Sequence, residues 1–256
     1  MDVFTILIAG GTGVGLWRIA QNVASPQVVR RVISGLLVLT GSLLGARTGY
    51  TVEHWQYLST HLLEIPQLWL GGLSWPGAII GALLVIALLS WEANIPYLRM
   101  ADQFAPLVQP LAITAWIGCW LVGSGYGATL PQNTWWGIAA LDETGAMALR
   151  FPVQPLAAIS LIAYYGLLEY KIPRRIPTGA YSSLCGLGLA VNLLLFSLIM
   201  VDTQPIWMGL HMDSWNALLF LVLCSITFAY VEWGWKFRKR IRLPLLFNTL
   251  HLRKNS

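Results

Sequence analysis

Gly45-Ala46-Arg47-Thr48-Gly49-Tyr50 places an arginine inside an apolar segment of the chain. Gly41, Gly45 and Gly49 recur at four-residue steps, so they share one helix face and let a neighbouring helix approach closely. Arg47 is two residues from Gly45 and from Gly49 and therefore projects from roughly the opposite side. Because lipid is a costly neighbour for a guanidinium, we predict that Arg47 faces a polar cavity. The alternative is that its side chain snorkels to the lipid headgroups.

The composition indicates an integral membrane protein. Of the 256 residues, 56% are hydrophobic and 11% are charged, and the mean hydropathy is +0.63. Such a chain is too apolar for an ordinary soluble domain. A helix needs about 20 mostly apolar residues to cross a bilayer, and hydropathy predicts an all-α, polytopic fold with seven transmembrane helices. Their predicted limits are 3–23, 32–50, 74–93, 104–125, 152–170, 179–201 and 214–235.

The organisation along the chain is simple. The first apolar stretch has no basic residue ahead of it, so we expect it to stay as a helix and not to be removed as a signal peptide. We predict one membrane domain over 1–235 and a basic cytoplasmic tail over 236–256. Cys119, Cys185 and Cys224 fall within predicted spans, which argues against a disulfide framework.

The distribution of cations predicts the orientation, because loops rich in Lys and Arg stay in the cytoplasm. Fourteen of the sixteen Lys and Arg residues lie on alternate loops or in the tail. The amino terminus is therefore expected outside and the carboxy terminus inside. Arg47 and Arg150 are the exceptions, both expected at the outer membrane edge. The net charge of +5 fits anionic lipid headgroups and does not suggest nucleic acid, since the cations flank the spans.

Residues 51–70 carry an amphipathic pattern that predicts an outer helix lying in the membrane interface. Its apolar positions recur at spacings of three and four residues: Trp55, Leu58, Leu62, Ile65 and Trp69. His54 and His61 share one face near Glu53 and Glu64, a set that could be imagined as metal ligands. No motif such as H-E-x-x-H is present, so we expect a solvated polar face and no metal.

Three other polar residues have specific expectations. Asp102 is predicted to cap the start of the 104–125 helix or to lie in its first turn. Asn192 is predicted to donate a hydrogen bond between helices. Arg150 has a simple alternative role, a surface pair with Asp142 or Glu143.

Five stretches follow one another along the chain: Gly45 to Tyr50, Gly71 to Gly81, Ala101 to Pro106, Ala115 to Gly127 and Arg150 to Gln154. In this order and with this sidedness they resemble the motifs of the prolipoprotein diacylglyceryl transferase family. That family's G-G/A-R-x-G-Y matches the first stretch, and its R-H-P-x-Q matches the last. The resemblance implies a seven-span protein of the bacterial inner membrane with its amino terminus outside. It also implies transfer of the diacylglyceryl group of phosphatidylglycerol to a prolipoprotein cysteine, with release of glycerol phosphate.

The departures from the family pattern fall at polar positions for which the resemblance implies a part in the reaction. The histidine of the second motif is Pro76 here, and the arginine and asparagine of the fourth are Trp116 and Cys119. An acidic position after the last motif is Ala157, and the late Y-G-x-x-R-x-x-x-E segment has no clear counterpart in 182–196.

The resemblance nevertheless supplies candidate site residues. Arg47 and Arg150 would hold the phosphate and stabilise charge as it leaves. The matched motifs supply no base for the thiol, so the candidates are His54 or His61 on the outer segment, and we take His54. The expected substrate-binding residues are Tyr50, Ser74, Gly77 and Gln154. No cofactor is expected, and the expected partners are phosphatidylglycerol and a prolipoprotein signal peptide. The competing hypothesis is a non-catalytic relative that binds anionic lipid or a partner membrane protein. A channel or transporter fits less well, because charged pathway residues are missing from the predicted spans.

Overall fold

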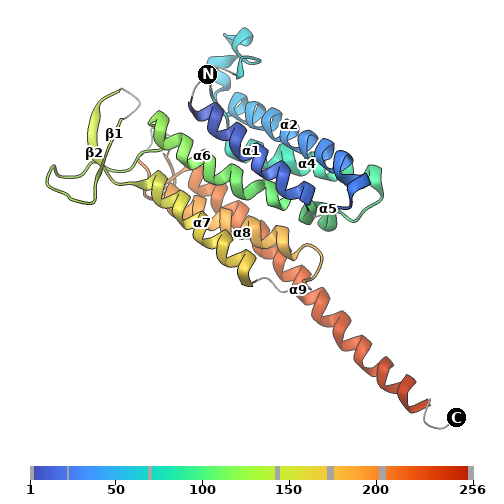
Figure 1. Ribbon diagram of the computed structural model, residues 1–256. Helices are drawn as coiled ribbons and strands as arrows, with labels where there is room; N and C mark the ends of the chain where they lie inside the picture. Colours follow the sequence, from blue (N-terminus) through green and yellow to red (C-terminus); the bar gives the residue numbers. More distant parts are fainter. Residues whose placement is uncertain are drawn as a thin grey trace.

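The computed structural model is a bundle of antiparallel helices with two short hairpins at one end (Figure 1). It describes residues 3–21, 23–68, 71–141, 145–171, 176–201 and 206–252. The long helices are α1 (Val3–Gln21), α2 (Val28–Glu53), α4 (Trp75–Ala93), α6 (Val108–Val122), α7 (Val153–Lys171), α8 (Ala180–Ser197) and α9 (Met212–Leu252). The shorter helix α5 (Tyr97–Phe104) leads through the 3-10 turn Ala105–Leu107 into α6.

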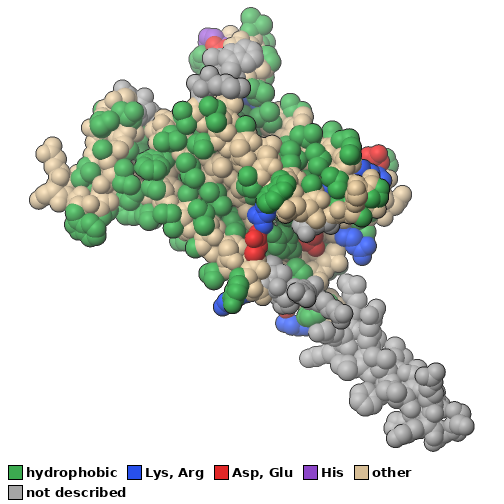
Figure 2. Space-filling view, in the orientation of Figure 1, with side chains coloured by type: hydrophobic (Ala, Val, Ile, Leu, Met, Phe, Trp, Pro, Cys, Tyr) green, Lys and Arg blue, Asp and Glu red, His purple; other side chains and the backbone are tan. Residues whose placement is uncertain are grey.

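The chain is a polytopic membrane protein. Within its described residues, six helices are long and apolar enough to cross a membrane, and a helix lies over every stretch that hydropathy predicted. The fifth predicted span, α7, has 19 residues but falls outside that set of six. Its second half carries Tyr164, Tyr165, Glu169 and Tyr170, which lower its hydropathy. Figure 2 shows hydrophobic side chains over the flank of the bundle, as expected for helices in lipid.

Glycine sets the closest helix contact, which joins α2 to α4. A Cβ atom on Gly45 would lie 2.3 Å from the carbonyl oxygen of Gly77, and one on Gly81 would lie 2.1 Å from that of Gly41. No larger residue fits at such separations, so the small-residue face of α2 is what allows the two backbones to touch. The prediction that this face packs on a neighbouring helix is confirmed. Further contacts then run from α2 to α1 and on through α6, α7, α8 and α9, in that order.

The outer segment after α2 differs from the sequence prediction. The expected continuous amphipathic helix over 51–70 was wrong, because α2 itself extends to Glu53 and only short turns follow: α3 (Trp55–Leu58) and a 3-10 turn, Leu62–Glu64. His54 leaves the helical conformation, with φ −111° and ψ 29°, and Pro66 cannot donate a backbone hydrogen bond. The segment 51–68 therefore has amphipathic spacing in its sequence but does not form a continuous helix. Trp69 lies outside the described residues.

Two hairpins stand at the end of the bundle where α2 finishes and α4 and α7 begin. β1 (Ile138–Leu141) pairs antiparallel with β2 (Met147–Arg150), and β3 (Ile206–Trp207) pairs with β4 (Leu210–His211). The first hairpin projects beyond the bundle in Figure 1. Its ladder ends at the pair Ile138 and Arg150, so the strand delivers Arg150 to the head of α7.

The carboxy-terminal helix continues past the predicted start of the tail. α9 runs without interruption from Met212 to Leu252, and Figure 1 shows it leaving the bundle. The boundary expected at residue 236 is therefore not a break in the helix. Contact of the 236–256 segment with the inner leaflet stays a prediction.

Candidate functional site

Arg47 holds the outer segment together. Its side chain is buried, with 7% of its surface exposed, and it donates to four backbone carbonyls. Nε lies 2.7 Å from the oxygen of Ile65, Nη2 lies 2.5 Å from that of Glu64, and Nη1 lies 2.6 and 3.0 Å from those of Gly71 and Gly72. The polar surroundings predicted for this guanidinium are thus its own chain's carbonyls, and its side chain does not snorkel.

The residues around Arg47 include most of the predicted substrate-binding set. The Tyr50 ring lies 5.5 Å from the guanidinium carbon and stacks on His54 with centroids 4.1 Å apart. Ser74 is buried; its N–H donates to the carbonyl of Ala46 at 3.0 Å. Gly77 lies in the contact between α2 and α4, against Gly45 and Gly49.

Two further contacts fix the side chains of Ser74 and His54. The Ser74 hydroxyl donates to Glu53 at 2.6 Å, which ties the start of α4 to the end of α2. Nδ1 of His54 lies 3.1 Å from the carbonyl oxygen of Tyr50. Because a carbonyl only accepts, this contact assigns the proton to Nδ1 and leaves Nε2 as the basic nitrogen.

Arg150 and Gln154 form a second group where β2 meets α7. Arg150 is 7% exposed, and its guanidinium lies 4.3 Å from the centroid of the Tyr126 ring. Gln154 is 2% exposed and donates from Nε2 to the carbonyl of Ser124 at 2.9 Å. Asp142 and Glu143, the surface partners considered for Arg150, lie outside the described residues.

Both groups occupy the same end of the bundle, as the directions of α2, α4 and α7 require (Figure 1). Each arginine is held by protein and neither extends into open water. Whether the two guanidinium groups share one pocket stays a prediction.

The side chains of Trp116 and Asn192 fill space between α6, α7 and α8. Trp116 Nε1 donates to Asn192 Oδ1 at 2.9 Å, and Asn192 Nδ2 donates to the Ala157 carbonyl at 3.0 Å and to Ser160 Oγ at 2.8 Å. The prediction that Asn192 donates between helices is confirmed. Trp116 also meets the Phe196 ring edge-on at 6.0 Å, so aromatic packing occupies the position that the sequence resemblance matched to an arginine.

Two other residues lie in surroundings that the sequence did not predict. Asp102 was predicted to serve its own helix, but its carboxylate accepts from Gly179 N at 2.6 Å and from Ser182 N at 2.9 Å, at the start of α8. His211, on β4, has a buried Nδ1 for which the described residues supply no hydrogen-bond partner. The sequence predicted a capping role for Asp102 but not the helix that it caps.

Comparison with known proteins identifies the family. A family model described as prolipoprotein diacylglyceryl transferase matches residues 1–234. The chain belongs to this family. Three relatives, each named phosphatidylglycerol–prolipoprotein diacylglyceryl transferase, are similar to it. The protein from Bordetella avium is 31% identical over 152 residues, 58% of this chain and 56% of that protein.

The other two relatives match longer regions of this member of the family. The protein from Thermosynechococcus vestitus is 25% identical over 194 residues, 75% of this chain and 64% of that protein. The protein from Burkholderia ambifaria is 27% identical over 229 residues, 77% of this chain and 76% of that protein. The match to the Bordetella and Thermosynechococcus proteins thus covers less than two thirds of their length.

Proposed function

We propose that this protein binds phosphatidylglycerol at the end of the bundle that holds Arg150 and transfers its diacylglyceryl group to a prolipoprotein cysteine. The observation that carries the proposal is the buried Arg150 guanidinium at the head of α7, held against Tyr126 in a protein of this family. A buried cation beside the membrane surface suits a phosphate group, because charge-assisted hydrogen bonds gain strength away from water.

Arg47 has a different part in the proposal. Its four bonds hold the carbonyls of Glu64, Ile65, Gly71 and Gly72, so it acts mainly as a positioning residue for the chain on either side of Ser74 and Tyr50. The phosphate would then lie between the segment that Arg47 holds and Arg150, with Gln154 in the first turn of α7.

The transfer forms a carbon–sulfur bond and breaks a carbon–oxygen bond. The cysteine sulfur attacks the glyceryl carbon that carries the phosphate, and glycerol phosphate leaves with the electron pair. A thiol has a pKa of about 8.5, so a base must accept its proton. His54 is proposed for this step because its tautomer leaves Nε2 free to accept, on an exposed ring next to the segment that Arg47 organises.

We propose that α7 is a seventh span and that the amino terminus is outside. Large apolar side chains along α7 are exposed, including Ile159 at 60% and Ile162 at 53%, which suits contact with lipid. Arg18, Arg30, Arg99 and Lys171 lie at the helix ends opposite the Arg150 end, as a cytoplasmic surface requires. The inner membrane of a bacterium is the proposed location, with the Arg150 group facing outward.

A second candidate function is phospholipid binding without transfer, or attachment of a partner membrane protein through the same surface. It is favoured by the Trp116 and Asn192 contact, which fills space between α6, α7 and α8 and puts an indole where the family motif has a guanidinium. The two candidates differ in whether a carbon–sulfur bond forms.

The test uses purified protein, phosphatidylglycerol vesicles and a lipobox peptide, with peptide mass and released glycerol phosphate as readouts. The matched variants are Arg150→Ala and Arg30→Ala, the second removing an exposed cation from the opposite end of the bundle. Transfer by the wild type and by Arg30→Ala, but not by Arg150→Ala, is expected. No transfer, under conditions where the Burkholderia ambifaria protein modifies the peptide, would refute the enzyme and leave the binding candidate.

A further inference from the structure

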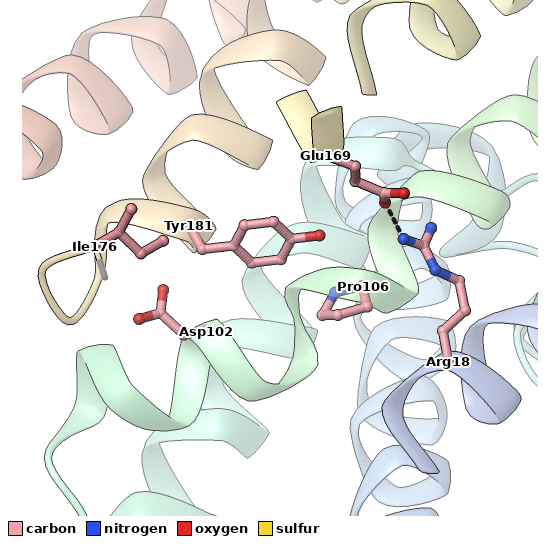
Figure 3. A pocket seen from close by; sticks show the side chains of 6 residues that line it. All are labelled: Arg18, Asp102, Pro106, Glu169, Ile176 and Tyr181. Carbon is pink, nitrogen blue, oxygen red and sulfur yellow. Dashed lines mark hydrogen bonds and ion pairs between the residues drawn. The ribbon is translucent and has the colours of Figure 1, made fainter. Parts of the chain in front are cut away.

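The polar groups of the pocket at the opposite end of the bundle from Arg150 are bonded to the protein itself (Figure 3). Arg18 donates to Gln109 and to Glu169, and Gln109 donates to the Tyr181 hydroxyl at 2.9 Å. These bonds join the helix ends that line the pocket to one another. Backbone groups that point to an open edge are found instead on the hairpin beside Arg150.

β1 is an edge strand, whereas β2 is paired on both sides. On one side β2 pairs with β1. On its other side the Leu130 N–H donates to the Leu149 carbonyl at 2.7 Å, and the Phe151 N–H donates to the Ala128 carbonyl at 2.9 Å. Among the residues that the structure describes, β1 has a neighbouring strand only on the β2 side.

The bonds on the far side of β2 show which way the backbone of β1 points. The N–H and C=O of a strand residue point to one edge, and those of the next residue point to the other. Leu149 and Phe151 bond away from β1, so Arg150 bonds toward it. Ile138 lies opposite Arg150 and bonds back to β2. The N–H and C=O of Ala139 therefore point to the open edge, where no described residue bonds them.

The open edge of β1 lacks the protection that exposed edges normally have. Proteins block such edges with proline, with charged side chains or with a covering element. β1 reads Ile-Ala-Ala-Leu, and Ala139 is exposed. A Cβ atom on Gly123 would lie 3.2 Å from the Leu141 carbonyl oxygen, so the end of α6 stands beside the last residue of the strand. A further strand can therefore approach β1 over its first half, next to Arg150.

We propose that the open edge of β1 pairs with an extended segment of the prolipoprotein that contains its reactive cysteine. The segment is added to the hairpin as a strand, held by main-chain hydrogen bonds to Ala139. This inference rests on the proposed function, because it names the part of the site that holds the protein substrate.

Pairing at this edge brings the cysteine to the Arg150 group. Residues directly opposite one another in a sheet share a face, so a peptide residue opposite Ile138 lies on the face of Arg150. Two strand spacings, about 10 Å, separate the two backbones. This face is turned to the bundle, since Ile138 and Ala140 are half-buried whereas Ala139 and Leu141 are exposed. The lipid phosphate would then lie between the Arg150 guanidinium and the cysteine.

The test measures peptide binding apart from transfer, with the full-length protein in nanodiscs that contain no phosphatidylglycerol. The probe is a fluorescent lipobox peptide whose cysteine is replaced by serine, and its binding is followed by anisotropy. Each of a set of analogues carries one N-methyl group, placed at successive residues. N-methylation removes one N–H, and only alternate N–H groups of a paired strand face β1.

Binding is expected to weaken about tenfold at every second N-methyl position and to stay unchanged at the residues between. Ala139→Pro removes the N–H at the open edge and should weaken the unmodified peptide about tenfold. Met147→Pro makes the same change at an exposed residue of β2, whose N–H points to the other edge, and is the matched control. Hydrogen exchange at Ala140 and Ala148, which pair across the ladder, checks that both variants keep the hairpin.

An N-methyl scan without alternation, or equal peptide affinity of the two proline variants, would overturn the proposal. Self-association that Ala139→Pro abolishes, without peptide binding, would assign the edge to a second copy of the chain and overturn it as well. Alternating peptide binding without transfer in the lipid assay would support the pairing while refuting the proposed function. Transfer by Ala139→Pro at the wild-type rate would do the reverse.

Discussion

Replacing Arg47 by methionine tests whether this residue organises the outer segment. Methionine keeps an apolar stem of similar length but removes the donors to the carbonyls of Glu64, Ile65, Gly71 and Gly72. Each buried acceptor that loses its donor costs about 1–3 kcal/mol. The segment lies at the surface and water can reach part of it, so the low end applies. Four carbonyls then give a loss of about 3–4 kcal/mol in the free energy of opening this segment.

Hydrogen exchange reports that loss directly, because local opening governs exchange of protected amides. The amides to follow belong to Glu64, Ile65, Gly71 and Ser74, which donate to His61, Leu62, Leu68 and Ala46, respectively. A loss of about 3 kcal/mol should speed their exchange about a hundredfold. Peptides from α8 should be unchanged.

The matched control is Arg30→Met, which changes an exposed arginine on the same helix. Exchange in residues 61–74 should be the same in this variant as in the wild type. If Arg47→Met and Arg30→Met exchanged at equal rates across this segment, the positioning role would be refuted. Arg47 would then have to be explained by ligand binding alone.

Three further predictions address packing and protonation. Gly45→Ala should destabilise the protein by about 3 kcal/mol in thermal unfolding, because its Cβ would lie 2.3 Å from a backbone oxygen, whereas Gly13→Ala meets nothing within 4 Å and should be neutral or mildly stabilising. Asn192→Leu should cost about 1–2 kcal/mol in the same assay, since an indole N–H between the helices loses its acceptor. The Glu64 carboxylate raises the pKa of Tyr57 above its ordinary value, so Glu64→Gln should lower that pKa in an ultraviolet titration. The folded pKa exceeds the unfolded one, and the contribution of Tyr57 to stability should therefore decline as pH rises through about 10.

The fold was largely predictable because it rests on local signals. Apolar runs mark the helices wherever they cross lipid, since backbone groups there must bond internally. The four-residue glycine spacing marked a contact face on α2, and α4 indeed packs on that face. The outer segment was mispredicted for the same reason: amphipathic spacing identifies a face but does not require an unbroken helix.

The candidate site was less predictable, because hydrogen-bond partners are set by three-dimensional position. Asp102 was expected to cap its own helix and instead caps α8, 77 residues away at Gly179. Trp116 was noted as a replacement for a family arginine, yet its acceptor lies 76 residues further along the chain. Nothing in the local pattern around either residue encodes which helix stands opposite.

The sequence by itself determined that this is a membrane protein of glycine-packed helices, and it predicted most of the cations at one end, because hydropathy, residue size and charge act wherever the residue sits. Only the tertiary structure decided what the buried polar groups bond. Arg47 could have met lipid, ligand or protein, and it is the folded outer segment that brings four carbonyls to its guanidinium. The pocket lined by Arg18, Asp102 and Glu169 likewise exists only because the ends of several helices converge. The hydrogen bonds that a side chain can make follow from its residue type, whereas the partner that it finds depends on how the whole chain packs.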